Sequence, residues 1–508
     1  MAPPPLKSAL VAEFFGTLLL VTAVGCCVTS GSPLGVTAIA LTLMVSIYAL
    51  GDVSGANFNP AVSLCLGLCG KLPWTHVGAY TAFQIFGGLT GGLWAYSFCL
   101  GDPSPSRPVL VPTSSIMMAM IGECLFTAML CLVVLSVAAT KSNKPNNHFG
   151  LAIGLTIIGG GHALGKVSGG ILNPAVGIGL LPQIAMDPAV TAIAVFKDHL
   201  ASLPMLVLGQ LLGSVLAFGM YRVLHPEEFS EEADADSSPG TVSKLTAEFV
   251  GTFYLVLTVT LNVLAGNPLG AWSIAATLAA MVYSLGCVSG GHLNPSVSLA
   301  LALRTETAEL TWAYIVAQVL GGITAAQLAF PLSGTPWGSV HGLTDGAGFS
   351  YEMASACELV FTTLLVFAVL CIATVEGKDT RDLTGFIVGS CVTVGGFAVG
   401  RISGASLNPA VTLGLCSTKL LSNNFPMYAL CFYLIDELLA SGVAVSIFSS
   451  THQVSLEAKQ LFDDEDSEKG YGTSEKADLP TLGVSEEAPA AAVLGGSRRS
   501  VAAPAEAS

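Results

Sequence analysis

The chain repeats one Asn-Pro motif four times, each time after a loop of small residues. The motif reads SGANFNPAVSL at 54–64, SGGILNPAVGI at 168–178, SGGHLNPSVSL at 289–299 and SGASLNPAVTL at 403–413. Asn is a preferred N-cap and Pro a preferred first helical residue, so each stretch predicts the start of a helix. Asparagine amides brought together at such helix starts can donate hydrogen bonds to a neutral oxygen. The motif residues are Asn59, Pro60, Ala61, Asn173, Pro174, Ala175, Asn294, Pro295, Ser296, Asn408, Pro409 and Ala410.

The four motifs recur at constant spacing. Asn59 and Asn294 are 235 residues apart, and so are Asn173 and Asn408. One constant offset predicts two copies of the same unit. Within each copy the two asparagines are 114 residues apart, so each unit is itself doubled. Three predicted membrane spans per repeat is an odd number, which predicts an inverted repeat with its functional site near the bilayer midplane.

The elements that must position these motifs are apolar helices. The chain has 508 residues, of which 52% are hydrophobic and 10% charged, whereas soluble domains carry about 25% charged residues. A segment of about 20 apolar residues can span a bilayer as a helix. We expect twelve spans, at 9–30, 34–52, 76–100, 116–139, 149–165, 203–224, 244–264, 269–287, 311–331, 353–375, 384–400 and 426–449.

The apolar stretch after each Asn-Pro pair, such as 61–67, is too short to span. We expect a half-helix that enters the bilayer and ends near its middle, since irregular backbone at that depth is tolerated only where it is buried or lines a wet cavity. In an inverted pair the two half-helix N-termini meet, and each contributes about half a positive charge. The sequence therefore predicts a site that repels cations and accepts neutral molecules.

The predicted fold class is an all-α membrane protein of two units, each with six transmembrane helices and two re-entrant half-helices. We place the first unit at 1–225, an acidic linker at 226–240, the second unit at 241–450 and an acidic tail at 451–508. The tail's composition predicts disorder, and two arginines before Ser500 indicate a phosphorylation site. With both termini inside, connections assigned to the cytoplasm carry nine Lys and Arg against five outside, which favours cytoplasmic termini.

The chain resembles the aquaporin, or major intrinsic protein, family. The resemblance rests on the paired Asn-Pro-Ala motifs, on Glu13 and Glu123, and on Gln84 with Gly87 and Gly88, a pair that also predicts close helix packing. It covers both units and leaves out the linker and the tail. It implies one narrow pore per unit that passes water or small neutral solutes by diffusion. Family members assemble as tetramers, so the resemblance implies that two chains form a four-pore pseudo-tetramer.

The resemblance also assigns an outer constriction to each unit. Its four positions fall on Ile39, Gly161, Gly170 and Val176 in the first unit, and on Ile274, Gly396, Ala405 and Val411 in the second. Most water-selective members have Arg where this chain has Val176 and Val411. The departure is similar to some tonoplast intrinsic proteins, although these usually keep a His that is absent here. We expect a wider, less polar mouth that admits ammonia, urea, glycerol or hydrogen peroxide besides water.

Three polar residues near the constriction have two interpretations each. Lys166 and Arg401 stand at equivalent places, seven residues before Asn173 and Asn408. They are either solvated outer-loop charges or cations that fold inward and replace the missing Arg. His162 lies beside a constriction position and is either pore-facing or structural.

Carboxyl groups inside the apolar segments are expensive and therefore indicate a role. The predicted spans contain Glu13, Glu123, Glu248 and Glu358. A proton relay is one interpretation, whereas the family resemblance implies structural hydrogen bonds to the loops before each Asn-Pro-Ala. Glu437 aligns with Gln84, Gln210 and Gln318, and Asp436 stands beside it. A water-filled groove, a subunit interface and a pH-responsive site all remain open for this acidic pair.

Two rival classes must be weighed against a channel. A twelve-helix secondary transporter would move two halves around one shared site, but each half here has its own complete pair of motifs. A non-conducting membrane scaffold is the other alternative. We expect no enzyme activity, metal or cofactor, because no nucleophile–base set or cofactor loop is visible and the cysteines are scattered through apolar runs. Lys and Arg are too few and dispersed for a nucleic-acid partner.

Overall fold

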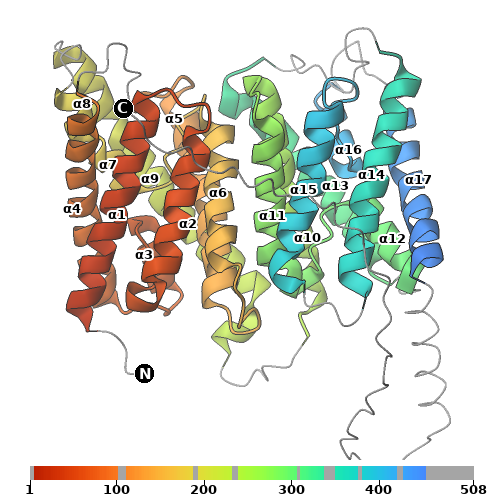
Figure 1. Cartoon of the computed structure of the whole chain (residues 1–508), viewed down its shortest axis with the longest axis horizontal. Helices are drawn as coiled ribbons and strands as arrows, with labels where there is room; N and C mark the ends of the chain where they lie inside the picture. Colours follow the sequence, from red (N-terminus) through yellow and green to blue (C-terminus); the bar gives the residue numbers. More distant parts are fainter. Residues whose placement is uncertain are drawn as a thin grey trace, which may run out of the picture. The chain divides into compact units, whose positions relative to one another are not determined.

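The computed structural model describes residues 5–100, 110–186, 193–230, 238–305, 309–336, 349–375, 380–419 and 427–452. The predicted tail from residue 453 on, with Ser500, and residues 231–237 of the predicted linker lie outside the described residues. Regular structure in the described part is entirely helical, which confirms the all-α class. The helices run side by side in parallel and antiparallel directions (Figure 1).

Twelve long helices form the body of the two predicted units. The first six are α1 (Leu6–Thr29), α2 (Gly35–Ser54), α4 (Trp74–Phe98), α5 (Ile116–Val134) with the π-helical turn η1 (Leu135–Ala139), α6 (Phe149–Leu164) and α9 (Ile193–Leu224). The second six are α10 (Thr241–Ala265), α11 (Gly270–Ser289), α13 (Thr311–Ser333), α14 (Tyr351–Thr374), α15 (Thr384–Val399) and α17 (Met427–Thr451). Each lies at a predicted span.

Helix α9 corrects one predicted boundary. The sixth span was expected at 203–224, but the helix begins ten residues earlier, at Ile193. Polar residues at 197–199 interrupt the apolar run, and Pro204 lies inside the helix. Both features are typical of a span boundary in sequence. The helix continues past them because Lys197 and Asp198 are exposed near its end, where polar side chains cost little.

Four short helices start at the Asn-Pro motifs. They are α3 (Pro60–Leu68), α7 (Pro174–Gly179), α12 (Pro295–Thr305) and α16 (Pro409–Ser417), and a further short helix, α8 (Leu181–Met186), follows α7. At about 1.5 Å per residue, a nine-residue helix reaches about half of a hydrocarbon core of about 30 Å. In Figure 1, α3 and α12 lie in the lower half and α7 and α16 in the upper half, as an inverted repeat requires.

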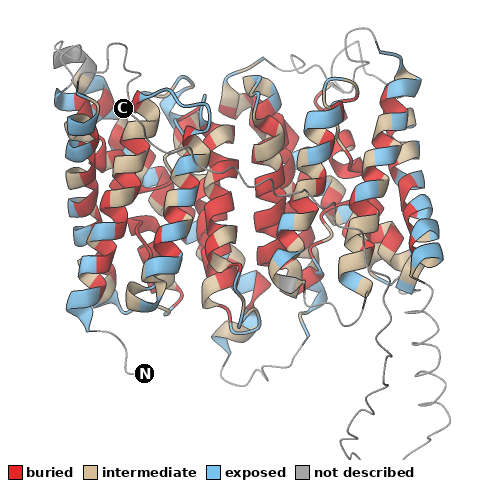
Figure 2. Ribbon diagram, viewed as in Figure 1, coloured by how far each residue is buried: buried red, intermediate tan, exposed pale blue. Residues whose placement is uncertain are grey.

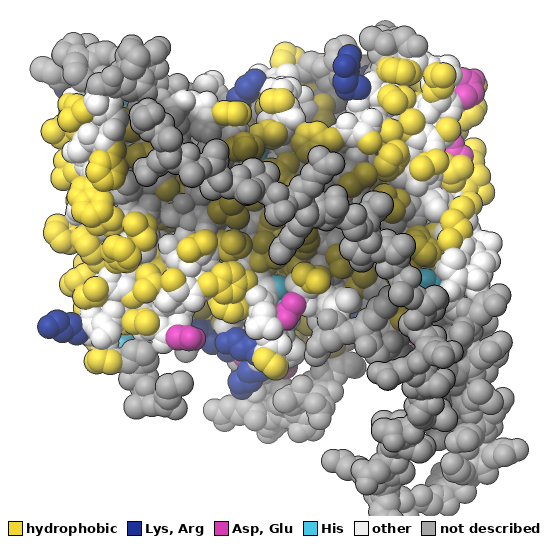
Figure 3. Space-filling view, viewed as in Figure 1, with side chains coloured by type: hydrophobic (Ala, Val, Ile, Leu, Met, Phe, Trp, Pro, Cys, Tyr) yellow, Lys and Arg dark blue, Asp and Glu magenta, His cyan; other side chains and the backbone are white. Residues whose placement is uncertain are grey.

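The outer surface suits a lipid environment. Nine of the described helices are long and apolar enough to cross a membrane, and α4, α6 and α15 complete the twelve predicted spans. Large apolar side chains are exposed on their outward faces, among them Trp74, Phe86 and Trp312, each at least 60% exposed. Figure 2 shows these exposed faces, and Figure 3 shows apolar side chains over the middle and charged ones mostly near the helix ends. The chain is an integral membrane protein.

Small residues let the half-helices pack closely against the long ones. A Cβ atom added to Gly88 in α4 would lie 2.5 Å from the carbonyl oxygen of Ala175 in α7. The equivalent Gly322 in α13 has the same relation, also at 2.5 Å, to Ala410 in α16. Since side chains cannot approach backbone this closely, glycine is required at both places.

The two six-helix units contact each other mainly through α5 and α6 of the first and α10 and α11 of the second, with further contacts from α9 and α13. Ser273 Oγ in α11 donates to Gly159 O in α6 at 3.0 Å, and Tyr254 OH in α10 donates to Leu125 O in α5 at 3.0 Å. Hydrogen bonds between buried hydroxyls and backbone carbonyls fix the register of helices in an apolar interface.

The start of the predicted linker is ordered. Residues Pro226–Phe229 form a 3₁₀ turn, η3. The Glu228 carboxylate accepts from Lys71 Nζ at 2.5 Å and from Lys141 N at 2.7 Å. Burial raises the pKa of Glu228, but these two hydrogen bonds and the charges of Lys71 and Lys141 together outweigh it, so that the net pKa is lowered. This part of the linker is therefore attached to loops of the first unit.

Candidate functional site

Each motif asparagine caps the half-helix that follows it. Asn59 has extended backbone with φ −153°, and its Oδ1 accepts from Ala61 N at 2.9 Å, with Pro60 as the first helical residue. The corresponding caps at Asn173, Asn294 and Asn408 also measure 2.9 Å. Since the Oδ1 atom faces its own helix, the amide Nδ2 is directed away from it.

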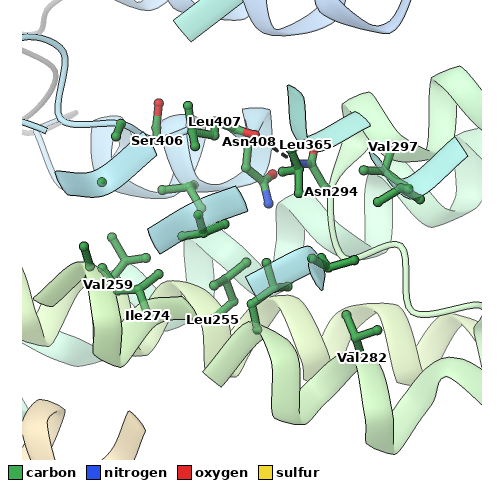
Figure 4. A pocket seen from close by; sticks show the side chains of 18 of the residues that line it. Leu255, Val259, Ile274, Val282, Asn294, Val297, Leu365, Ser406, Leu407 and Asn408 are labelled. Atoms are coloured by element: carbon green, nitrogen blue, oxygen red, sulfur yellow. Dashed lines mark hydrogen bonds between the residues drawn. The ribbon is translucent and has the colours of Figure 1, made fainter. Parts of the chain in front are cut away.

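The two asparagines of a unit bind each other's loop. Asn59 Nδ2 donates to Leu172 O, and Asn173 Nδ2 donates to Phe58 O, both at 2.9 Å. In the second unit, Asn294 and Asn408 make the same pair of bonds to Leu407 O and Leu293 O, again at 2.9 Å. Figure 4 shows Asn294 and Asn408 meeting in this way. Each Nδ2 uses one of its two hydrogens, so the other remains for a ligand.

The residue before each asparagine has a left-handed backbone. Phe58, Leu172, Leu293 and Leu407 have φ of 49°, 52°, 50° and 51°. Bulky residues rarely adopt this region, and a strained residue of this kind costs about 1–3 kcal/mol and is typical of functional sites. Its carbonyl oxygen is the acceptor for the facing asparagine. The strained backbone therefore presents the carbonyl oxygen through which the two half-helices of a unit are joined.

Buried carboxylates hold these strained loops. Glu13 is fully buried and accepts from Ser54 Oγ at 2.6 Å and Gln84 Nε2 at 2.8 Å. It also accepts from the backbone N–H groups of Asn57 at 3.0 Å and Phe58 at 2.8 Å. Four donors can compensate a carboxylate for the loss of water. These contacts favour the structural role over the proton relay for Glu13.

The same arrangement occurs twice more. The partners of Glu123 are Ser168, Ile171, Leu172 and Gln210, and those of Glu248 are Ser289, His292, Leu293 and Gln318. In each case one hydroxyl, two backbone N–H groups and one glutamine amide donate. The equivalence of the quarter-repeats thus extends to individual hydrogen bonds.

The fourth quarter departs from the arrangement. Glu358 accepts from Leu407 N at 2.7 Å and Ser406 N at 3.2 Å, but Glu437 stands where the glutamine would donate. Glu437 is fully buried, and its Oε1 accepts from Asn408 N at 3.2 Å. Asp436, beside it, accepts from Ser355 Oγ of α14. Glu437 therefore lies neither on an outer face nor in an open groove.

A cavity passes each pair of asparagines. The first has a volume of about 1000 Å³ and the second about 750 Å³. Both motif asparagines of a unit lie in the wall of its cavity. So do the eight residues assigned to the constrictions, Ile39, Gly161, Gly170 and Val176 in the first unit and Ile274, Gly396, Ala405 and Val411 in the second. Apolar side chains such as Leu255, Val259 and Ile274 make up much of the second wall (Figure 4).

The outer polar residues have different positions in the two units. Arg401 lies in the wall of the second cavity. Its counterpart Lys166 is not among the described residues that line the first, and its Nζ donates to Ala265 O of the second unit at 2.6 Å. His162 is also outside the described lining of the first cavity, and its counterpart Phe397 in the second unit is 56% exposed. Lys166 and Arg401 are both exposed and equivalent in sequence, but their surroundings differ between the two units.

Two polar residues of the second cavity were not singled out from sequence. Asn262 and Asn267 line its outer part, and Asn267 Nδ2 donates to Asn262 Oδ1 at 2.8 Å. The 235-residue offset aligns them with Cys27 and Ser32. A residue-by-residue comparison of the two units would have found this difference in the sequence. The two asparagines make the mouth of the second cavity more polar than that of the first.

Comparisons with known proteins identify the family of the chain. The family model described as major intrinsic protein matches residues 3–186, 162–267, 261–401 and 380–475. Aquaporin NIP1-1 of Oryza sativa subsp. japonica is 35% identical over 185 residues, which cover 34% of this chain and 64% of that protein. Aquaporin AqpM of Methanothermobacter thermautotrophicus is 32% identical over 221 residues, which cover 36% of this chain and 89% of that protein.

A solved structure, that of the aquaglyceroporin from Plasmodium falciparum, matches with a TM-score of 0.39 and 21% identity over 44% of this chain and 99% of that one. The family matches together extend over both six-helix units, and each relative matches about a third of the chain. The chain is a member of the major intrinsic protein family.

Proposed function

We propose that the chain is a passive membrane channel with one pore in each six-helix unit, open to water and small neutral solutes. The observation that carries the proposal is the reciprocal pair of bonds between the two half-helix starts of each unit, in the wall of a cavity about 750–1000 Å³ in volume. A solute that passes the pair meets amide N–H donors on one side and apolar side chains on the other.

Exclusion of cations follows from the same geometry. The half-helices meet with their N-termini, and each N-terminus carries about half a positive charge. The asparagine Nδ2 atoms present hydrogens, and no carboxylate among the described residues accompanies them in the cavity walls except Asp52 in the first. The oxygen of a neutral solute can accept hydrogen bonds from these donors. A cation would lose its hydration water there and find no oxygen ligands to replace it.

Breadth of the solute range is the finer part of the proposal. Val176 and Val411 occupy the place of a cation at the constriction, next to the small residues Gly170 and Ala405. Without a fixed charge there, ammonia, urea, glycerol or hydrogen peroxide pass at lower cost. Arg401 in the wall of the second cavity adds a cation there that the described wall of the first cavity has only as Lys144.

Flux through single-unit variants tests the proposal. Purified protein is reconstituted in vesicles, and water and solute permeation are measured by stopped flow for the parent, Val176→Trp, Val411→Trp and the double variant. Two independent pores predict a loss of about half the flux in each single variant and of nearly all in the double. A transporter with one shared site would lose nearly all its flux with either change, and a scaffold would have none to lose.

We also propose that two chains assemble into one four-pore particle. In the apolar stretch of α11, 72% of the residues are buried, but only 22% in the equivalent α2; the values for α5 and α14 are 72% and 28%. Leu41 in α2 is 46% exposed, whereas the equivalent Ala276 is 1% exposed against the other unit. The exposed helices α2 and α14 are thus equivalent to α11 and α5, which are buried where the two units meet within the chain. A second copy of the chain would cover α2 and α14 in the same way.

Assembly and topology can be measured directly. Native mass spectrometry of the detergent-solubilised protein should give a dimer, and a monomer at all protein concentrations would refute the assembly. Labelling of single cysteines placed at 71 and 166 from either side tests the cytoplasmic placement of both termini that the positive-inside rule favours.

A further inference from the structure

The fourth quarter-repeat pairs two carboxyl groups where the other three pair a carboxyl with an amide. In the third quarter, Gln318 Nε2 donates to Glu248 Oε2 at 2.7 Å. In the fourth, Glu437 faces Glu358, and both side chains are fully buried. None of the ion pairs between described residues involves either group. Two negative charges would therefore be buried together without a cation, which is strongly unfavourable.

The hydrogens between the two carboxyl groups do not suffice for the contacts observed. Ser406 Oγ lies 3.2 Å from Glu358 Oε2 and 2.7 Å from Glu437 Oε1. Thr412 Oγ1 lies 2.9 Å from Ser406 Oγ and 2.7 Å from Glu437 Oε1. These four oxygen–oxygen contacts have only the two hydroxyl hydrogens of Ser406 and Thr412. One more hydrogen, on Glu437, makes three: Glu437 donates to Ser406, Ser406 to Glu358, and Thr412 to Glu437. The fourth contact, between Thr412 Oγ1 and Ser406 Oγ, then has no hydrogen of its own.

The surroundings of the second oxygen of Glu437 also favour a protonated, neutral carboxyl group. Glu437 Oε2 is buried and has no hydrogen-bond partner. The Oε1 atoms of Gln84, Gln210 and Gln318 are buried without a partner in the same way. A glutamine at this position donates through the two hydrogens of its Nε2 atom. Glu437 can therefore act as a donor in the same place only if its Oε1 atom carries a hydrogen. An ionised carboxylate with a dry, unpaired oxygen costs far more than a neutral acid.

We propose that Glu358 and Glu437 bind one proton between them through Ser406, and that this proton keeps the second pore open. The inference rests on the proposed channel function. Asn408 N donates to Glu437 Oε1, and Leu407 N donates to Glu358 Oε2, so both carboxyls hold the loop that presents the motif asparagine. Loss of the proton places two like charges against this loop. Asn408 then leaves its position, and flux through the second pore falls as pH rises.

Other titratable groups around the pair come from three helices. They are Cys357 on α14, Cys416 on α16, and Tyr433 and Asp436 on α17, with Lys419 in electrostatic contact with Cys416. Tyr has an ordinary pKa of about 10, whereas that of Cys is about 8.5, so that an ordinary thiol ionises within the tested pH range. Both cysteines remain in Glu437→Gln, so a fall in flux that they cause would persist in that variant. Asp436 is the other carboxyl group, and it contacts Ser355 of α14 and neither carboxyl group of the pair. Its replacement by Asn is therefore the matched control.

The test isolates the second pore by closing the first with Val176→Trp. Vesicle flux is compared at about pH 6 and about pH 9, a range that covers the known behaviour of buried carboxyl groups. We expect a fall of at least about fivefold at the higher pH, the lower end of couplings between sites. Glu437→Gln should conduct equally at both values, and Asp436→Asn should keep the fall. Persistence of the fall in Glu437→Gln would overturn the proposal.

A converse variant transfers the property to the first pore. With the second pore closed by Val411→Trp, the first pore has Glu123 with Gln210 and should conduct independently of pH. Gln210→Glu together with Ile171→Ser, which supplies the counterpart of Ser406, builds a second carboxyl pair there and should make the first pore lose flux at about pH 9. A first pore that keeps its flux after this change would count against the carboxyl pair as the cause.

A spectroscopic measurement separates the proton site from the channel function. Infrared difference spectra between the parent and Glu437→Gln should contain the carbonyl stretch of a protonated carboxyl at about pH 6, and this band should disappear with rising pH. If no flux is found in any variant but the band is present, the channel proposal fails and the proton site stands. If the band is absent while the variant unfolds at the same temperature as the parent, the proton site is refuted.

Discussion

Removal of one buried carboxylate should disable one pore and leave the other intact. Glu123→Ala takes away the acceptor of Ile171 N at 2.9 Å and Leu172 N at 2.8 Å. Ser168 and Gln210 also lose their acceptor, but their side chains can turn, whereas the two backbone N–H groups cannot. A buried donor without a partner costs about 1–3 kcal/mol, so the two together predict a destabilisation of about 2–6 kcal/mol.

The effect should reach the pore because of what Leu172 does. Its carbonyl oxygen accepts from Asn59 Nδ2 at 2.9 Å, and it does so from a left-handed backbone with φ 52°. Without Glu123, the strained loop relaxes and the bond between the half-helices is lost. Water flux of the first pore, measured in vesicles with the second pore closed by Val411→Trp, should fall to near the level of protein-free vesicles.

Two controls make the result interpretable. Glu123→Gln keeps the volume and one acceptor oxygen, but its amide hydrogens face those of Gln210, so we expect an intermediate loss. Reversible unfolding in mixed micelles gives the change in free energy. A destabilisation below about 0.5 kcal/mol, the usual effect of a surface substitution, together with unchanged flux would refute the assignment of Glu123 as the support of the loop.

Three further perturbations address the constriction, the linker and the helix packing. Val176→Arg restores a cation at the first constriction and should lower glycerol flux by about half while water flux changes less, since one of two pores is narrowed; stopped-flow measurements check it. The pKa of Glu228 is raised by burial but lowered more by hydrogen bonds from Lys71 and a backbone N–H. Its contribution to stability is therefore present above the ordinary carboxyl range and lost as pH falls through the lowered pKa, so thermal unfolding of Glu228→Gln should differ from the parent at about pH 7 but not at about pH 2. Gly88→Ala puts a Cβ 2.5 Å from a carbonyl of α7 and should cost about 1–3 kcal/mol of unfolding free energy, whereas Gly78→Ala on the same helix meets nothing within 4 Å and should not destabilise.

The sequence by itself determined the repeat, the helical class and the starts of the half-helices. These features are local. An apolar run of sufficient length predicts a span wherever it occurs, and an Asn-Pro pair caps a helix through bonds to its own first turn, as Asn59 does to Ala61. The constant offset then made Glu437 visible as an acid in a position otherwise held by glutamine. The early start of α9 was not predicted because Pro204 and the polar residues before it are also typical of a helix boundary.

Only the tertiary structure decided which of the possible partners each polar residue has. Lys166 and Arg401 are equivalent in sequence, yet Lys166 meets a carbonyl of the other unit and Arg401 lines a cavity, because only the first lies beside a second unit within the chain. A leucine in the sequence does not indicate a left-handed backbone, yet Leu172 has one. It is held there because its carbonyl oxygen accepts from Asn59 and its N–H donates to Glu123. Such outcomes depend on contacts between residues more than 40 positions apart, and a local pattern contains no information about them.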